Sequence, residues 1–309
     1  MEPQTTVTAR VGALKSALAG GVVPAMATPL LPGTHTVNTA VVGPLVEFLL
    51  ARGVKGLFVG GTTGEGTQLD DDQRRALHEA AVSAAAGRVP VLLHVGAQRT
   101  AAAVALARHA AGLGPAALVA MTPTFYGLSD DALARYFHAI ADAVPDLPLF
   151  LYDIPQFAVN GIGPALLARL AGEMPSLAGL KSSRVDIQIV RQLIDALPRD
   201  HIVLAGNESA ALASLSLGAD GLISGLSTAI PEPFVALTRA AAAGQLDEAR
   251  EWQRTINKLL GVLGGARIGG IKAILVQRGI PVGPPVPVLD ATDAPLWPRA
   301  AEILGLAAG

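Results

Sequence analysis

A lysine at position 181 closes a short apolar segment, in the run G-L-K at 179–181. Burying an ammonium group is costly, so a lysine in such a place needs a partner or a chemical task. Burial lowers the pKa of an amine, and the neutral amine is the form that attacks carbonyl carbons. We therefore predict that Lys181 is a nucleophile that forms an imine, with a snorkelling side chain or a structural ion pair as the alternative.

Tyr152 and a glycine-rich loop follow two other apolar segments. A phenol at the end of a strand relays protons or, in the simpler reading, only packs at a rim. Residues 60–66 read G-G-T-T-G-E-G. Their glycines let backbone N–H groups approach a ligand, and the two hydroxyls add donors that suit a carboxylate. No Gly-Lys-Ser/Thr follows, so this is not a nucleotide-phosphate loop, and a tight turn is the alternative.

These three features together are what imine chemistry requires. An amine attacks the carbonyl, a phenol moves the proton, and a hydroxyl-bearing glycine loop holds a carboxylate. The combination is more specific than any one of its members, and it requires a fold that brings the three segments to one place.

Short apolar segments alternate with longer segments of helical periodicity. The predicted strands are 22–28, 56–59, 89–95, 117–121, 147–152, 178–181, 202–205 and 221–224. The predicted helices between them are 38–52, 70–87, 99–112, 129–144, 163–172, 186–197 and 207–217. This pattern predicts an α/β fold, a (β/α)8 TIM barrel, whose chemistry gathers at the carboxyl ends of the strands. A doubly wound open sheet is less favoured, because no G-x-G-x-x-G follows the first strand.

After residue 231 the predicted strands stop. Further helices are predicted at 232–243, 246–263, 267–279 and 293–306. We therefore expect three parts: an N-terminal extension at 1–20, a barrel at 21–243 and a small C-terminal helical region at 244–309.

The composition of the 309-residue chain excludes several classes of function. Apolar residues make up 51%, the net charge is −2 and aromatic residues make up 4%, so no surface suits nucleic acid. The absence of cysteine excludes disulfides, thiolate nucleophiles and cysteine-ligated metals. Glu2 and Lys15 weigh against an export signal, and no uncharged apolar run is long enough to span a membrane. We expect a cytoplasmic enzyme with no nucleic-acid or membrane partner.

At these motifs the sequence resembles the dihydrodipicolinate synthase / N-acetylneuraminate lyase family of class I, Schiff-base-forming aldolases. The motifs are G-T-T-G-E at 61–65, Y-x-I-P at 152–155 and G-x-K-x-S at 179–183. The resemblance extends from about residue 21 to the C-terminal helices.

The resemblance implies a role for each matching residue. Lys181 would form the imine with pyruvate or a 2-keto-3-deoxy acid, and Tyr152 would shuttle the proton with Thr62 as its link to the relay. Thr63 and the backbone of the loop, including Gly61, would bind the 2-oxo acid carboxylate. The protonated imine serves as the electron sink, so the resemblance implies no cofactor and no metal. It also implies a homo-oligomer, commonly a tetramer built as a dimer of dimers.

Three departures from the family pattern bear on the substrate. Phe157 stands where the synthases of lysine biosynthesis usually carry an arginine that binds a second carboxylate, so dihydrodipicolinate synthesis is disfavoured. Phe125 aligns with the relay tyrosine that a neighbouring subunit contributes, and Tyr126 is the candidate replacement. Residues 206–209 read G-N-E-S where neuraminate lyases usually carry G-x-D-E.

The G-N-E-S sequence at 206–209 still predicts a polar substrate site. Gly206, Glu208 and Ser183 are predicted to contact substrate hydroxyls, and Phe157 to form a partly apolar wall. Aldolases and dehydratases of 2-keto-3-deoxy sugar acids therefore agree best with the sequence. Hydratase-aldolases of aromatic pyruvate derivatives agree with the apolar wall as well.

Some alternatives to an aldolase would use the same imine-forming residues, and others would not need them. A dehydratase would use the same enamine to expel a β-hydroxyl as water, and 4-hydroxy-tetrahydrodipicolinate synthase is a further alternative. A non-catalytic sensor would be expected to lose the lysine or its partners, and no dinucleotide signature supports a flavin or nicotinamide enzyme.

Three other polar residues are predicted to be structural. His94 ends the third predicted strand with no second ligand at metal spacing, which indicates a rim or core histidine. Glu65 is assigned to stabilising its loop beside a helix start. Lys272 lies in an apolar stretch of the C-terminal region and is predicted to be a snorkelling surface lysine.

Overall fold

The computed structural model describes residues 3–306, which form two compact units. The first consists of Met1–Ala19 with Pro90–Ile223, and the second of Gly20–Val89 with Ser224–Gly309. Each unit is therefore built from segments that are far apart in the sequence. The sequence predicted three consecutive parts, divided at residues 20 and 243, and that division stays a prediction.

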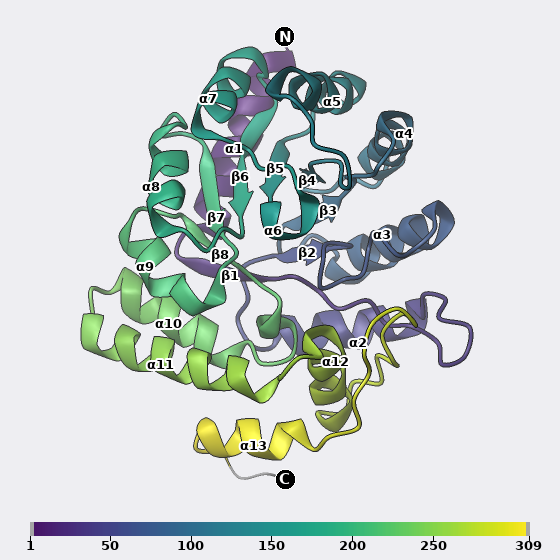
Figure 1. The fold of residues 1–309 in the computed structure, drawn as a ribbon, viewed down its shortest axis with the longest axis vertical. Coiled ribbons are helices and arrows are strands. Elements are labelled where there is room, and N and C mark those ends of the chain that lie inside the picture. Colours follow the sequence, from purple (N-terminus) through teal and green to yellow (C-terminus); the bar gives the residue numbers. More distant parts are fainter. Residues whose placement is uncertain (1–2, 307–309) are drawn as a thin grey trace. The chain divides into compact units, whose positions relative to one another are not determined.

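The first unit contains parallel strands that neighbour one another in strict chain order. They are β3 (Val91–His94), β4 (Ala117–Met121), β5 (Leu149–Asp153), β6 (Leu177–Ser182), β7 (Ile202–Ala205) and β8 (Gly221–Ser224). Their order from β8 down to β3 contains no reversal (Figure 1). A doubly wound sheet reverses its strand order at a switch point, so this arrangement argues against the open-sheet alternative.

Helical segments connect these strands, and the longer ones bury one face. They are α4 (Thr100–Ala111), α5 (Asp130–Ala143), the short α6 (Pro155–Ala158), α7 (Pro164–Glu173), α8 (Ile187–Asp195), η1 (Glu208–Ala210) and α9 (Ala211–Ser216). In α5 the hydroxyl of Ser129 caps the first turn by accepting a hydrogen bond from the Ala132 N–H. The buried stripe of α5 includes Leu133, Phe137 and Ile140, at the spacing of an amphipathic helix. α6 and the split of the predicted 207–217 helix into η1 and α9 were not predicted.

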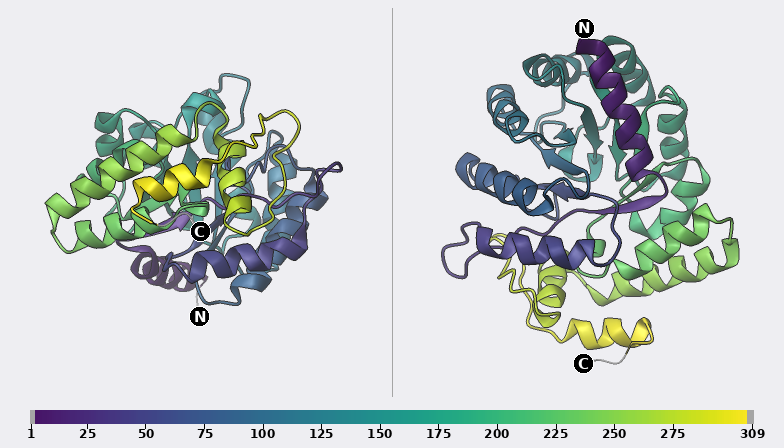
Figure 2. Two further views of the ribbon diagram at one scale, coloured as in Figure 1. Left: turned by 90° about the horizontal axis from the view of Figure 1, so that it is seen from below. Right: turned by 180° about the vertical axis from the view of Figure 1, so that it is seen from behind.

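The N-terminal helix α1 (Pro3–Leu18) covers the amino ends of strands in its unit, as the right-hand view of Figure 2 shows. Arg10 donates to the carbonyls of Asp146 and Pro115, which precede β5 and β4. Lys15 donates to the Arg199 and His201 carbonyls before β7 and pairs with Asp220 before β8. The helix therefore lies at the end of these strands that is opposite to the one where a barrel carries its chemistry.

The second unit contains the remaining strands and the C-terminal helices. Its elements are β1 (Gly21–Pro24), α2 (Thr39–Leu50), β2 (Leu57–Val59), α3 (Asp71–Ala85), η2 (Leu226–Thr228), α10 (Glu232–Ala242), α11 (Leu246–Val262), α12 (Arg267–Gln277) and α13 (Leu296–Ile303). Beyond β1, a parallel bridge joins Ala25 to Phe58 of β2. α10 and α11 lie side by side in both views (Figures 1 and 2). The C-terminal helical region is thus part of the same compact unit as the glycine-rich loop after β2.

In chain order, eight strands alternate with helices, and additional helices follow the last strand. The predicted fold class, a (β/α)8 barrel with a C-terminal helical appendage, is confirmed. Within residues 3–306 no single helix is long and apolar enough to cross a membrane. α11 and α12 pass that test only as a pair, and the chain bends by 102° between them.

Candidate active site

The register of β5 and β6 brings Tyr152 and Lys181 together. The two residues are direct partners across the strands, and both side chains are buried. Nζ of Lys181 lies 3.7 Å from the centroid of the Tyr152 ring. The sequence predicted both residues at strand ends, and the structure places them in contact.

A bulge in β6 sets the direction of Lys181. Pairing with β5 shifts by one residue between Leu149 and Phe150, so Gly179 pairs with Phe150. A Cβ at position 179 would lie only 1.9 Å from the Ile202 carbonyl oxygen, so this close approach to β7 requires glycine. Bulges of this kind re-aim nearby side chains, which explains the glycine two residues before the lysine.

Burial is the largest influence on the Lys181 amine, and it lowers the pKa of Lys181 below its usual value. Tyr152 and the buried carboxylate of Glu208 act in the opposite direction without cancelling that effect. Glu208 belongs to η1, directly after β7. The environment therefore favours the neutral amine that a Schiff-base nucleophile needs.

Ser183 and Gly206 form the next contact beyond the lysine. The Gly206 N–H donates to the Ser182 carbonyl at 2.7 Å, and the Ser183 N–H donates to the Asp153 carbonyl at 2.9 Å. A Cβ at position 206 would lie 2.3 Å from Oγ of Ser183. Glycine at 206 thus leaves room for the Ser183 hydroxyl, which is one of the groups predicted to contact substrate.

Sequence reasoning missed a buried ion pair beside the Tyr152–Lys181 contact. Asp153 follows Tyr152, and its carboxylate accepts hydrogen bonds from Arg184 Nε at 2.7 Å and Nη2 at 3.2 Å. It also accepts bonds from the Ile162 N–H and the Ser182 hydroxyl. A carboxylate inside an apolar strand end was the available signal, because such a group requires a partner.

The aromatic residues predicted near the substrate lie at the surface of this unit. Phe125, Tyr126 and Phe157 are all exposed, and the rings of Phe125 and Tyr126 meet edge to face at 4.9 Å. Asn160 holds the loop after β4 by donating to the carbonyls of Pro123 and Tyr126. The relay role of Tyr126 and the wall role of Phe157 stay predictions.

The glycine-rich loop belongs to the second unit, whereas Lys181 and Tyr152 belong to the first. Thr62 is half-buried and Thr63 is buried. A Cβ at Gly225, after β8, would lie 2.5 Å from the Thr63 hydroxyl oxygen. In the next turn, a Cβ at Gly66 would lie 1.8 Å from the Gly60 carbonyl oxygen, so the loop closes more tightly than any other residue type permits.

His94 and Lys272 were both predicted to be structural, and the structure bears differently on the two predictions. His94 is buried with its ring 6.2 Å from that of Tyr152, and its role stays a prediction. The prediction of a surface position for Lys272 is wrong. Its side chain is buried in an ion pair with Glu65. The sequence did not reveal this pair, because the carboxylate that compensates for burial of the ammonium comes from a distant part of the chain.

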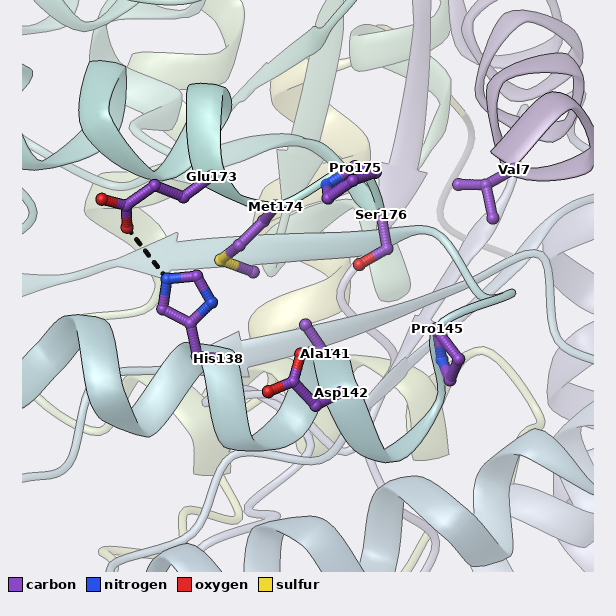
Figure 3. A pocket seen from close by; sticks show the side chains of 9 residues that line it. All are labelled: Val7, His138, Ala141, Asp142, Pro145, Glu173, Met174, Pro175 and Ser176. Carbon is purple, nitrogen blue, oxygen red and sulfur yellow. Dashed lines mark hydrogen bonds and ion pairs between the residues drawn. The ribbon is translucent and has the colours of Figure 1, made fainter. Parts of the chain in front are cut away.

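A cavity of about 160 Å³ opens elsewhere in the first unit, between α5 and the end of α7 (Figure 3). His138 and Glu173 form a hydrogen bond at one side of it, and Val7 of α1 lies at the other. Ser176 and Pro145 place this cavity near the amino ends of β6 and β5. It contains none of the predicted site residues. No cluster of metal-binding side chains occurs in the part of the chain that the structure describes.

The Dihydrodipicolinate synthetase family has a sequence model that matches residues 18–295. The chain belongs to this family. A 4-hydroxy-tetrahydrodipicolinate synthase of Exiguobacterium sp. is 35% identical over 89% of this chain and 95% of its own length. An N-acetylneuraminate lyase of Mediterraneibacter gnavus is 32% identical over 84% of each chain.

The family assignment extends to solved structures. A Ruminococcus gnavus sialic acid aldolase with a mutated catalytic lysine matches this chain with a TM-score of 0.89 and 28% identity, over 94% of this chain and 96% of that one. The resemblance stated from the sequence motifs is confirmed, as is the prediction of an enzyme of the lyase class. This member of the dihydrodipicolinate synthetase family is an aldolase or lyase.

Proposed function

We propose that the enzyme forms a Schiff base between Lys181 and pyruvate or a 2-keto-3-deoxy sugar acid, and cleaves or forms a carbon–carbon bond. The observation that carries this proposal is the Lys181–Tyr152 contact. A buried amine with a lowered pKa lies 3.7 Å from a phenol ring, at the carboxyl ends of two adjacent strands. Buried groups with a shifted pKa are concentrated at functional sites, which favours a chemical role for this lysine over a structural one.

The proposed reaction needs no group beyond the side chains. The neutral amine attacks the C2 carbonyl, and loss of water gives the protonated imine. Removal of the proton from the C4 hydroxyl breaks the C3–C4 bond, and its electron pair moves into the imine as an enamine while the aldehyde leaves. Protonation of C3 and hydrolysis of the imine release pyruvate and the free amine.

Tyr152 is proposed to carry the proton in these steps, since its ring already contacts the amine. The role of Thr62 as the link to the relay, and those of Thr63 and Gly61 in binding the carboxylate, rest on the family motif. Tyr126 is the candidate for the relay position that Phe125 cannot fill. No metal or cofactor enters the proposal.

A polyhydroxylated substrate is supported by the groups beyond the lysine. Ser183 and Gly206 adjoin each other, and Glu208 adds a buried carboxylate close enough to raise the pKa of Lys181. Phe157 offers an apolar surface where a second carboxylate would need a cation. We therefore propose a 2-keto-3-deoxy sugar acid in preference to the dihydrodipicolinate precursor. From the family resemblance we also propose a homodimer or homotetramer, and a cytoplasmic location stays a prediction.

A dehydratase is the second candidate, because the imine machinery is common to both reactions. The two differ in their products: an aldolase releases pyruvate from a 2-keto-3-deoxy acid, whereas a dehydratase releases water and keeps the carbon chain. Measuring pyruvate release separates them.

Borohydride trapping tests the proposal. Protein mixed with pyruvate is reduced, and the modified peptide is identified by mass spectrometry. We expect a stable adduct on Lys181 that is absent in Lys181→Ala and retained in Lys258→Ala, which removes an exposed lysine of α11. Folded wild-type protein that yields no adduct with pyruvate or longer 2-oxo acids would refute the proposal.

A further inference from the structure

A buried ion pair joins the glycine-rich loop to the C-terminal helical region of the second unit. Nζ of Lys272 in α12 lies 2.5 Å from Oε1 of Glu65, and the two side chains are 1% and 0% exposed. Both groups have further partners. Lys272 donates to the Pro284 carbonyl at 2.9 Å, and the Val286 N–H donates to Oε2 of Glu65 at 2.6 Å.

Glu65 occupies the point of the loop where backbone conformation is most demanding. Its φ is 57°, in the left-handed region that non-glycine residues rarely adopt. A residue stays in that region only where its surroundings over-determine it. The ion pair and the Val286 hydrogen bond supply such surroundings, because they fix the far end of the side chain.

The rest of the loop is fixed through its backbone. The Thr28 hydroxyl donates to the Gly64 carbonyl at 2.5 Å, and the Gly66 N–H donates to the Gly61 carbonyl at 3.1 Å. The Glu65 N–H donates to the Thr62 carbonyl at 3.0 Å. A change in the position of Glu65 is therefore transmitted to Thr62 and Thr63 through a single turn of chain.

A pair of charges buried this deeply is a poor way to gain stability. Desolvation of both ions offsets much of their attraction, and apolar residues of similar volume often replace such a pair without loss. The pair between Arg52 and Glu232 in the same unit is only partly buried, with side chains 30% and 34% exposed, and it joins the chain just after α2 to α10 without involving the loop. The placement of the Lys272–Glu65 pair agrees better with orienting the loop.

We propose that Lys272 is a positioning residue for carboxylate recognition. By holding Glu65, it fixes the loop conformation in which Thr63 and the backbone N–H groups of residues 61–66 receive the substrate carboxylate. The C-terminal helical region thereby takes part in substrate selection. This inference deepens the proposed function and rests on it for the identity of the bound group.

Two substitutions and a control separate positioning from stability. Lys272→Met leaves the Glu65 carboxylate without its cation. The double variant Glu65→Gln, Lys272→Met removes both charges and so avoids the penalty of a single buried ion. Glu232→Gln breaks ion pairs with Arg52 and Arg278 in the same unit and serves as the matched control.

The first measurement is the preference for a carboxylate. Initial rates of borohydride-trapped adduct formation on Lys181 are compared for pyruvate and for hydroxyacetone, a methyl ketone without a carboxylate. We expect the pyruvate-to-hydroxyacetone ratio to fall by about tenfold or more in both Lys272 variants, while Glu232→Gln keeps the wild-type ratio. The double variant should recover thermal stability but not the ratio, because methionine cannot hold the side chain at 65.

The second measurement is amide hydrogen exchange of the 61–66 segment, which does not depend on catalysis. We expect faster exchange there in the Lys272 variants and no change in Glu232→Gln. A double variant that regains both stability and preference, or loop exchange that is unchanged, overturns the inference. If wild-type protein forms no adduct at all, the proposed function fails, and exchange alone decides whether Lys272 positions the loop.

Discussion

Replacing Arg184 by methionine is expected to leave the Asp153 carboxylate buried without its cation. The two side chains are 17% and 0% exposed, so the carboxylate depends on the arginine far more than the arginine depends on the carboxylate. The change removes two charge-assisted hydrogen bonds, at 2.7 and 3.2 Å, and leaves the bonds from Ile162 and Ser182. Removing one partner of a buried ion pair costs about 3–5 kcal/mol of stability. Because two hydrogen-bond donors to Asp153 remain, we expect a cost near ~3 kcal/mol.

The reverse change, Asp153→Asn, is expected to cost less. The amide oxygen still accepts from the Ile162 N–H, and Arg184 keeps its partly solvated position, so the loss is about 1–2 kcal/mol. Combining the two changes removes both charges and should recover part of the loss caused by Arg184→Met alone.

Urea unfolding at neutral pH, followed by far-UV circular dichroism, measures these differences, and thermal scans provide a second reading. At about 2–4 °C per kcal/mol, a cost near 3 kcal/mol should lower the melting temperature of Arg184→Met by about 6–12 °C. An Arg184→Met protein as stable as wild type, or one more stable than Asp153→Asn, would show that the buried Asp153 carboxylate does not depend on Arg184.

Two further predictions concern the same strand ends. Because burial lowers the pKa of Lys181, the unfolded chain binds more protons than the folded one between that lowered pKa and 10.5, so wild-type stability rises with pH across this window. Lys181→Met should therefore be more stable than wild type at neutral pH, with the difference shrinking as the pH approaches 10.5. A stability gap that is independent of pH in urea titrations would contradict the lowered pKa. Gly206→Ala should cost about 1–3 kcal/mol, because its Cβ would lie 2.3 Å from Oγ of Ser183. Adding Ser183→Ala should restore part of that loss, and equal melting temperatures for the single and double variants would argue against the clash.

Local sequence patterns were sufficient to predict the strands and to place Lys181 and Tyr152 at strand ends. Short apolar, β-branched runs alternating with segments of helical periodicity marked the strands, and parallel strands place their carboxyl ends on one face. The sequence could therefore predict Lys181 and Tyr152 at neighbouring strand ends, and their roles in the reaction stay predictions. Their contact follows from the register of β5 and β6, and a bulge at Gly179 adjusts it.

Interactions between distant segments were beyond sequence reasoning. Lys272 looked like a surface lysine because nothing near it in the chain carries a negative charge that would neutralise it. Its partner Glu65 precedes it by most of the length of the protein. Asp153 and Arg184 were likewise missed, although each is conspicuous beside a reactive residue, because only the β5–β6 pairing brings them within hydrogen-bonding distance.

The discontinuous second unit has a consequence for synthesis on the ribosome. Glu65 and Val286, which share a hydrogen bond in the finished protein, are 221 positions apart. At a synthesis rate of about 5–20 residues per second, about 10–45 s pass between synthesis of the glycine-rich loop and synthesis of the segment that holds it. The strands β3 to β8 of the first unit, by contrast, are complete by residue 224. The nascent chain thus completes the half that carries the amine before it can close the half that carries the loop, and the last helices to emerge finish an element that was among the first to be made.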